Sequence, residues 1–150
     1  MAAADDRLAV TDLIYTYAER IDAGDFEGVA DLLADADLTF EGFDAVRRGR
    51  DQILALYRAT TRRYPDGTPR TRHLVTNVIV ERGPGEDRSS SRSTFTVLQA
   101  VDGALALQPI VAGRYRHRFE RTGDDWRITS LHMAVELVGD VGHHLLSGRP

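Results

Sequence analysis

Two residues carry most of the chemistry that this sequence offers: an aspartate at the end of a predicted helix and a histidine on a predicted strand. Asp22 lies in the last turn of the apolar-striped segment 11–26. Gly24 ends this helix because glycine accepts the left-handed backbone conformation of a helix C-cap. A carboxylate there faces the negative end of the helix dipole, so it needs a cation or a hydrogen-bond donor as partner. Histidine ordinarily titrates near neutrality, which makes His73 the best candidate for a general base.

A carboxylate and an imidazole together can move a proton. The carboxylate fixes the tautomer of the ring through one nitrogen and stabilises the imidazolium that forms when the other nitrogen takes a proton. In an apolar pocket that excludes water, such a pair can abstract a proton next to a carbonyl. Loss of a β-leaving group, double-bond migration or ring closure could follow. The alternative is structural: strand histidines are often only hydrogen-bonded, and aspartates at helix ends are often caps or surface charges.

Hydrophobic periodicity predicts three helices in the first half of the chain. In residues 11–21 apolar side chains recur at three- and four-residue steps, which is the spacing of one helix face. Asp25 is the expected N-cap of a second, short helix, and alternation over 38–43 predicts a short strand. A third helix follows the turn at 49–51 and ends before the turn at 65–67.

From Pro69 onward the apolar period changes from that of a helix to that of a strand. Four long strands are predicted, at 70–82, 89–101, 105–121 and 126–138. In the first of them His73, Val75 and Asn77 are expected on one face. In the third, three arginines face outward, toward solvent or another subunit, and alternate with inward-facing residues. The outward set is Arg114, Arg116 and Arg118, and the inward set is Tyr115, His117 and Phe119.

The end of the chain differs in composition from the strands before it. Residues 139–150 contain three glycines and predict a flexible tail with little regular structure. His143 and His144 lie in this tail and are expected to be solvated, although such a tail can also close over a pocket.

Helices followed by an antiparallel meander predict an α+β fold rather than an alternating α/β fold. Strands of roughly ten residues or more are long for a chain of this size, and their twist curls the sheet. We therefore expect three N-terminal helices packed on a strongly curved antiparallel sheet, a cone-like α+β barrel that encloses a pocket. The whole chain, 1–150, is expected to form a single domain.

The composition excludes several classes of protein. A net charge of -4 gives no electrostatic basis for binding nucleic acid or an anionic membrane. No segment approaches the roughly 20 apolar residues of a spanning helix, and the N-terminus lacks the features of a signal peptide. The absence of cysteine excludes disulfides and thiolate chemistry and suits a cytoplasmic protein. The sequence shows no metal-ligand spacing, phosphate loop or dinucleotide motif, so we expect no metal.

The order of these motifs resembles the SnoaL-like branch of the nuclear-transport-factor-2-like superfamily. The motifs that carry the resemblance are YAERIDAGDF, RGRDQI, TRH and FERTGDDWRI, and the similarity covers about residues 6–136. Within the branch the pattern is similar to scytalone dehydratase, bile-acid dehydratase and hexachlorocyclohexane dehydrochlorinase. These enzymes use no metal and no cofactor, so the resemblance implies that none is needed here.

The resemblance also implies roles for individual residues. Asp22 and His73 fall on the positions of the aspartate and histidine that these enzymes share, and Tyr17 matches a tyrosine of the bile-acid enzyme. Two positions depart from scytalone dehydratase: Leu98 replaces a second histidine, and Ile21 replaces a tyrosine. The expected roles are His73 as the base, Asp22 as the group that orients it, and Tyr17 as the hydroxyl that polarises the substrate.

We therefore expect a cofactor-independent lyase or isomerase, of the dehydratase or cyclase type, acting on a small, mostly apolar or polycyclic molecule. Tyr15, seven residues before Asp22, is an alternative hydroxyl donor. The expected pocket walls are Leu13, Phe40, Leu54, Tyr57, Val75, Asn77, Phe95, Val97 and Tyr115. Relatives of this fold form homodimers and homotrimers, and we expect one of the two here. The alternative is a non-catalytic ligand-binding protein or partner subunit of the same fold.

Overall fold

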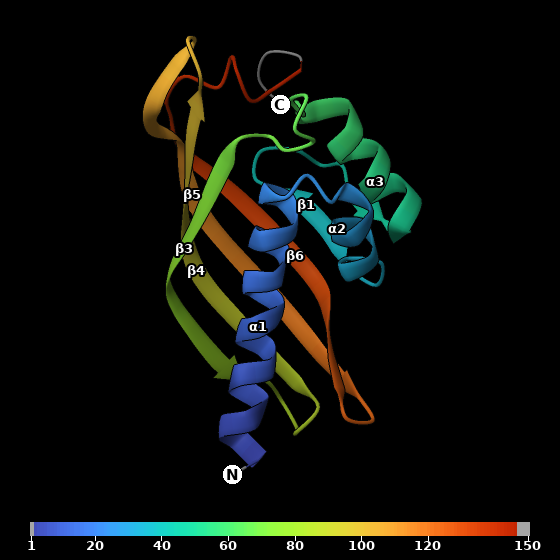
Figure 1. Cartoon of the computed structure of the whole chain (residues 1–150). Coiled ribbons are helices and arrows are strands. Elements are labelled where there is room, and N and C mark those ends of the chain that lie inside the picture. Colours follow the sequence, from blue (N-terminus) through green and yellow to red (C-terminus); the bar gives the residue numbers. More distant parts are fainter. Residues whose placement is uncertain (1, 147–150) are drawn as a thin grey trace.

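Three helices lie against one face of a curled sheet in the computed structural model, which describes residues 2–146, with side chains from residue 5 onward (Figure 1). The helices are α1 (Ala2–Asp22), α2 (Phe26–Leu32) and α3 (Gly49–Thr60). The strands are β1 (Asp37–Phe40), β2 (Arg47–Arg48), β3 (Thr71–Arg82), β4 (Arg88–Val101), β5 (Leu105–Thr122) and β6 (Asp125–Val138). The predicted α+β fold class is confirmed.

The sheet is an antiparallel meander with one parallel addition. Its strand order is β2-β1-β6-β5-β4-β3, and the four long strands pair as consecutive antiparallel neighbours. The short strand β1 pairs in parallel with β6, placing Leu38 opposite Leu131. Both of these leucines are fully buried, so β1 extends the hydrophobic core to the edge of the sheet. The sheet is therefore mixed rather than wholly antiparallel, and it is curled without being closed.

Helix α1 crosses the concave face of the sheet along its whole length (Figure 1). The apolar stripe predicted for it is buried: Val10, Ile14, Tyr17 and Ile21 are at most 3% exposed. Burying side chains of this size stabilises the fold by roughly 1.5–3 kcal/mol each. The stripe thus fixes the rotation of α1 about its axis and decides which residues of its last turn face β3.

A Schellman motif ends α1. Gly24 has φ +72°, its N–H donates to the carbonyl of Ile21, and the N–H of Asp25 donates to the carbonyl of Arg20. Asp25 then caps α2 as predicted, since its Oδ1 accepts from the N–H of Gly28 at 2.8 Å. The chain therefore turns sharply directly after Asp22.

A β-bulge in β3 changes which residues share a face with His73. The pairing with β4 shifts between Thr76 and Ile79, and Asn77 has φ +55°, a conformation that asparagine tolerates better than most residues. Beyond the bulge the alternation is reversed, so Asn77 is exposed. Its amide donates to the Thr94 hydroxyl at 3.3 Å. The prediction that Asn77 faces inward with His73 is wrong, because strict alternation cannot anticipate an inserted residue.

The C-terminal segment 139–146 is attached to the end of α3. Leu145 forms a β-bridge with Thr61, and the N–H of Leu146 donates to the carbonyl of Thr60 at 3.0 Å. The N–H of Arg62 donates to the carbonyl of His144 at 2.8 Å. His144 is only partly exposed, so the prediction that it is solvated is wrong. Residues 147–150 of the predicted tail lie outside the described residues.

The turn after α1 generates a stability prediction. A Cβ built on Gly24 would lie 2.0 Å from the carbonyl oxygen of Gly67, whereas one built on Gly42, at φ +83°, meets nothing within 4 Å. We expect Gly42→Ala to lower the free energy of unfolding by about 1 kcal/mol, the cost of its backbone conformation. Gly24→Ala should cost at least ~2 kcal/mol, since the clash adds to the same strain. Urea unfolding of both variants measures the difference, and equal losses would contradict the close approach.

Candidate active site

The Asp22 carboxylate joins the end of α1 to the start of β3 through three hydrogen bonds. Its Oδ1 lies 2.6 Å from Nδ1 of the His73 ring and accepts from the Thr71 hydroxyl at 2.8 Å. Its Oδ2 accepts from the backbone N–H of His73 at 2.7 Å. The side chains of His73 and Asp22 are 7% and 12% exposed. The two side chains that the sequence singled out therefore lie in direct contact at the edge of the core.

This geometry indicates which nitrogen of the neutral His73 ring carries the proton. An ionised carboxylate only accepts, so the 2.6 Å contact is a hydrogen bond when Nδ1 of His73 carries the proton. In the neutral ring Nε2 is then the acceptor, available to take a proton from another molecule. The three donors also offset the unfavourable position of Asp22 at the negative end of the helix dipole.

A cluster of three tyrosines lies on the core side of the His73 ring. The Tyr17 ring meets the His73 ring edge-on, with centroids 6.4 Å apart, and meets Tyr115 in the same way at 5.9 Å. The Tyr17 and Tyr57 hydroxyl oxygens are 2.8 Å apart. Burial raises the pKa of Tyr17 to about 12 and holds the pKa values of Tyr57 and Tyr115 well above their usual range. All three hydroxyls therefore stay protonated at physiological pH.

The structure separates the predicted wall residues into three groups. Those near the tyrosine cluster are buried in the core, and Phe95 stacks on Tyr115 with centroids 4.3 Å apart. This group comprises Leu54, Tyr57, Phe95, Val97 and Tyr115. Leu13 and Phe40 are partly buried and pack against the rim of the core. Only Tyr15 and Val75 line the groove beside the dyad, and Asn77 lies outside all three groups.

A groove of about 420 Å³ runs between α1 and the edge strand β3, and both dyad residues line it. Its remaining lining residues are Tyr15, Ala18, Glu19, Ala23, Thr71, Arg72 and Val75. The volume is within the range of small-molecule sites. Apolar side chains and a hydroxyl lie on its walls, so it could place a mostly apolar molecule against the His73 ring.

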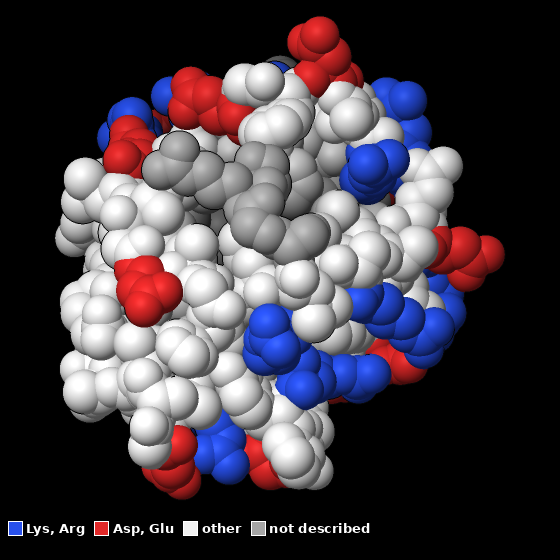
Figure 2. Space-filling view, turned by 90° about the horizontal axis from the view of Figure 1, so that it is seen from above, with Lys and Arg blue, Asp and Glu red and all other residues white. Residues whose placement is uncertain are grey.

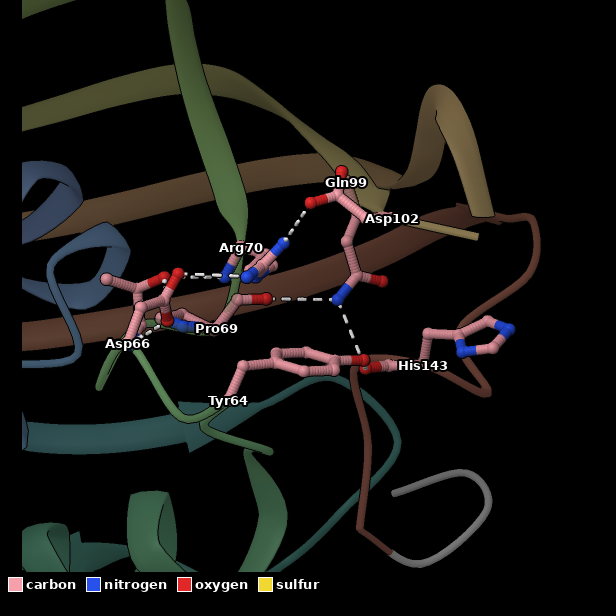
Figure 3. A network of polar contacts seen from close by, with 8 residues as sticks. Tyr64, Asp66, Pro69, Arg70, Gln99, Asp102 and His143 are labelled. Atoms are coloured by element: carbon pink, nitrogen blue, oxygen red, sulfur yellow. Dashed lines mark hydrogen bonds and ion pairs between the residues drawn. The ribbon is translucent and has the colours of Figure 1, made fainter. Parts of the chain in front are cut away.

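The C-terminal segment brings a further histidine toward the dyad. The carbonyl of His143 accepts from the Tyr64 hydroxyl at 2.6 Å and from the Gln99 amide at 3.1 Å (Figure 3). Gln99 pairs with Thr71 across β3 and β4, and the Thr71 hydroxyl donates to Asp22. The contacts of His143 therefore hold the C-terminal segment close to the dyad. Figure 2 shows the molecule from above relative to Figure 1. On this face uncharged residues cover much of the surface, and most charged residues lie toward its edges.

His144 is the candidate functional residue that sequence reasoning missed. Burial, and after it the nearby His73, lower the pKa of His144 to about 4, so the ring is neutral at physiological pH. Within the described residues its buried Nδ1 has no hydrogen-bond partner. The available signal was the apolar pair Val141 and Leu145, which resembles a short packed turn more than a solvated tail. Val141 does pack against the core.

His117 is a second buried histidine, and the inward orientation predicted for it is confirmed. It is 2% exposed, stacks on Phe119 with centroids 5.5 Å apart and meets Tyr115 edge-on. Burial lowers its pKa to about 4. Its Nε2 has no partner among the described residues. No group of three or more histidine, cysteine, aspartate or glutamate side chains that could hold a metal ion occurs in the described part of the chain.

Comparison with known proteins identifies the family. The model of the SnoaL-like domain matches residues 2–132, so the chain belongs to the SnoaL-like family, as its motifs predicted. No match was found among curated proteins. Among the described residues, no helix is long and apolar enough to cross a membrane.

Solved structures share the same architecture. An NTF2-like protein with a cystatin-like fold from Novosphingobium aromaticivorans is 25% identical with a TM-score of 0.69, covering 98% of this chain and 86% of its own. A protein of unknown function from Mycobacterium tuberculosis is also 25% identical, with a TM-score of 0.71 and coverages of 91% and 75%. A type 2 hexachlorocyclohexane dehydrochlorinase is 19% identical, with a TM-score of 0.72 and coverages of 99% and 93%. This last likeness shows the fold alone.

The burial of His117 predicts a pH dependence of stability. Its pKa is about 4 when folded, against an ordinary 6.5, so below pH 6.5 the unfolded chain binds a proton that the folded chain does not. Stability therefore falls as the pH falls through this window, and at pH 5 the loss from this residue is about 2 kcal/mol. His117→Phe keeps the stack on Phe119 and should lose about 2 kcal/mol less than wild type between pH 7.5 and pH 5. Urea unfolding at both pH values measures this, and equal losses would contradict the assignment.

Proposed function

We propose that this protein is a cofactor-independent lyase or isomerase in which His73 removes a proton from a carbon acid bound in the groove between α1 and β3. The observation that carries the proposal is the 2.6 Å contact between Nδ1 of His73 and Oδ1 of Asp22. It leaves Nε2 as the basic nitrogen and places a negative charge beside the imidazolium that forms. The SnoaL-like family match and the shared fold with a dehydrochlorinase support the class of reaction.

The chemical step is balanced without a cofactor. Nε2 of His73 takes the proton of a C–H bond next to a carbonyl or opposite a leaving group. The electron pair of that bond becomes a carbon–carbon double bond as hydroxide or a halide departs from the β-carbon. In an isomerisation the electron pair of the C–H bond forms the carbon–carbon double bond of an enolate as the π pair of the carbonyl moves onto its oxygen. The carbonyl re-forms when the imidazolium returns the proton at another carbon. General bases of this kind contribute about 10²–10⁴-fold to a rate.

The polarising hydroxyl is assigned to Tyr17, with Tyr15 as the alternative. The Tyr17 ring contacts the His73 ring, and its raised pKa keeps its hydroxyl a donor, which is the form that stabilises a developing enolate. Its hydroxyl also contacts Tyr57, so it can donate only as part of the tyrosine cluster. Tyr15 is more exposed and lines the groove directly.

The substrate expected for this groove is small and mostly apolar. Val75, Ala18 and the Tyr15 ring supply apolar contacts, whereas Glu19 and Arg72 lie at the rim with opposite charges. A neutral bicyclic molecule matches this mixture better than a strongly charged one. The competing function is ligand binding without catalysis, with Asp22 and His73 as a structural pair.

Two probes test the proposal: exchange of the α-protons of 1-tetralone in D₂O, followed by NMR, and chloride release from hexachlorocyclohexane. We expect wild type to accelerate at least one, and His73→Asn or Asp22→Asn to lower that rate about 10²–10⁴-fold. Tyr17→Phe should lower it less than either dyad variant, about tenfold. Arg118→Gln, which changes an exposed arginine of β5 outside the groove, is the matched control.

The readouts separate catalysis from binding. If His73→Asn binds 1-tetralone as wild type does and has lost turnover, His73 acts in the reaction. If the dyad variants keep the wild-type rate, or if wild type accelerates neither probe, the catalytic proposal is abandoned in favour of binding. A Tyr15→Phe variant that loses more activity than Tyr17→Phe would transfer the polarising role to Tyr15.

A further inference from the structure

A second pocket lies at the opposite end of α1 from the dyad. It has a volume of about 250 Å³ and lies between the first turns of α1, the β3–β4 turn and the start of β6. Asp6 lines this pocket and Asp22 lines the groove. These residues are sixteen positions apart on one helix, which corresponds to about 24 Å at 1.5 Å per residue. The two sites are therefore separate.

The walls of this pocket are apolar and aromatic. Val10, which is buried, and Val80 supply aliphatic surface. The indole N–H of Trp126 donates to Oδ1 of Asp6 at 3.0 Å, which fixes the orientation of its ring. The Arg121 guanidinium lies 5.5 Å from the centroid of that ring and contacts the same Asp6 oxygen at 3.2 Å. A rigid indole is thus presented beside a hydrophobic surface.

The residues that line the pocket carry more positive than negative charge, although the whole chain carries -4. Four arginines line it, against the two acids Asp6 and Glu86. Arg121 is shared between Asp6 and Asp87, and Arg88 contacts Glu120 at 3.4 Å. The other two arginines, Arg7 and Arg82, form no ion pair with any described residue. The guanidinium groups of Arg7 and Arg82 are therefore available to pair with a bound anion.

We propose that this pocket binds a small aromatic carboxylate or a similar aromatic anion. Trp126 offers a face or edge to the ring of such a molecule, and Val10 and Val80 offer apolar contact. A guanidinium matches a carboxylate with two parallel N–H donors, and Arg82 and Arg7 are available for this role. The volume limits the occupant to one or two rings. The proposal is independent of the chemistry at the dyad.

Trp126 provides a local readout because the sequence contains a single tryptophan. The probe is 4-nitrobenzoate, whose nitroaromatic ring quenches indole fluorescence on contact, and its neutral amide, 4-nitrobenzamide, is the comparison. We expect saturable quenching by 4-nitrobenzoate and at least tenfold weaker binding of the amide. Binding of the anion should also weaken as sodium chloride is added, since exposed charges are screened.

Two variants test the assigned arginines. Arg82→Gln and Arg7→Gln break no ion pair of the described structure, and each should weaken 4-nitrobenzoate binding about tenfold. Arg118→Gln is the matched control, because this arginine is exposed on the outward face of β5 and also lacks an ion pair with the described residues. It should bind the probe as wild type does.

Two outcomes of these binding measurements would overturn the proposal for the pocket. Quenching that rises linearly without saturation, or that is the same for the acid and the amide, would be collisional and would overturn the proposal. Saturable binding that Arg82→Gln and Arg7→Gln leave unchanged would also overturn it. Because the probe reports at Trp126, which binds Asp6 at the opposite end of α1 from Asp22, failure of this test says nothing about the dyad.

Discussion

The Asp22 carboxylate is the interaction on which the arrangement of the site depends. It lies where a helix dipole disfavours negative charge, and it is held there by the Thr71 hydroxyl, the His73 N–H and the His73 ring. Two of the three contacts come from one residue, so backbone and side chain of His73 are fixed together. The same carboxylate thereby fastens α1 to the edge strand and sets the tautomer of the imidazole.

Surroundings on the two sides of the imidazole differ in kind. The core side is occupied by the cluster of Tyr17, Tyr57 and Tyr115, whose burial keeps their hydroxyls protonated. The other side opens to the groove between α1 and β3. His144 approaches from the C-terminal segment as a neutral ring with an unpartnered Nδ1 among the described residues. The imidazole therefore lies between a buried cluster of hydroxyls and a groove that is open to another molecule.

The sequence could predict those parts of the structure that local patterns determine. Helical spacing in α1 and alternation in β5 correctly gave the buried faces that carry Tyr17 and His117. The turn at Gly24 and the placement of Asp22 followed from local rules of helix capping. The bulge at Asn77 could not be predicted, because one inserted residue does not change the composition of the strand. It nevertheless moves every later side chain of β3 to the opposite face of the sheet. Burial of His144 was also missed, since the segment that carries it is held by long-range contacts of the His143 carbonyl with Gln99 and Tyr64.

Determining the tautomer of His73 tests its proposed role as a base most directly. A ¹H–¹⁵N NMR correlation of the imidazole, recorded at a pH where the ring is neutral, distinguishes protonation at Nδ1 from protonation at Nε2. We predict a proton on Nδ1, engaged by Asp22, and an unprotonated Nε2. A neutral ring protonated at Nε2 would contradict it, because His73 could not then accept a proton from a molecule in the groove.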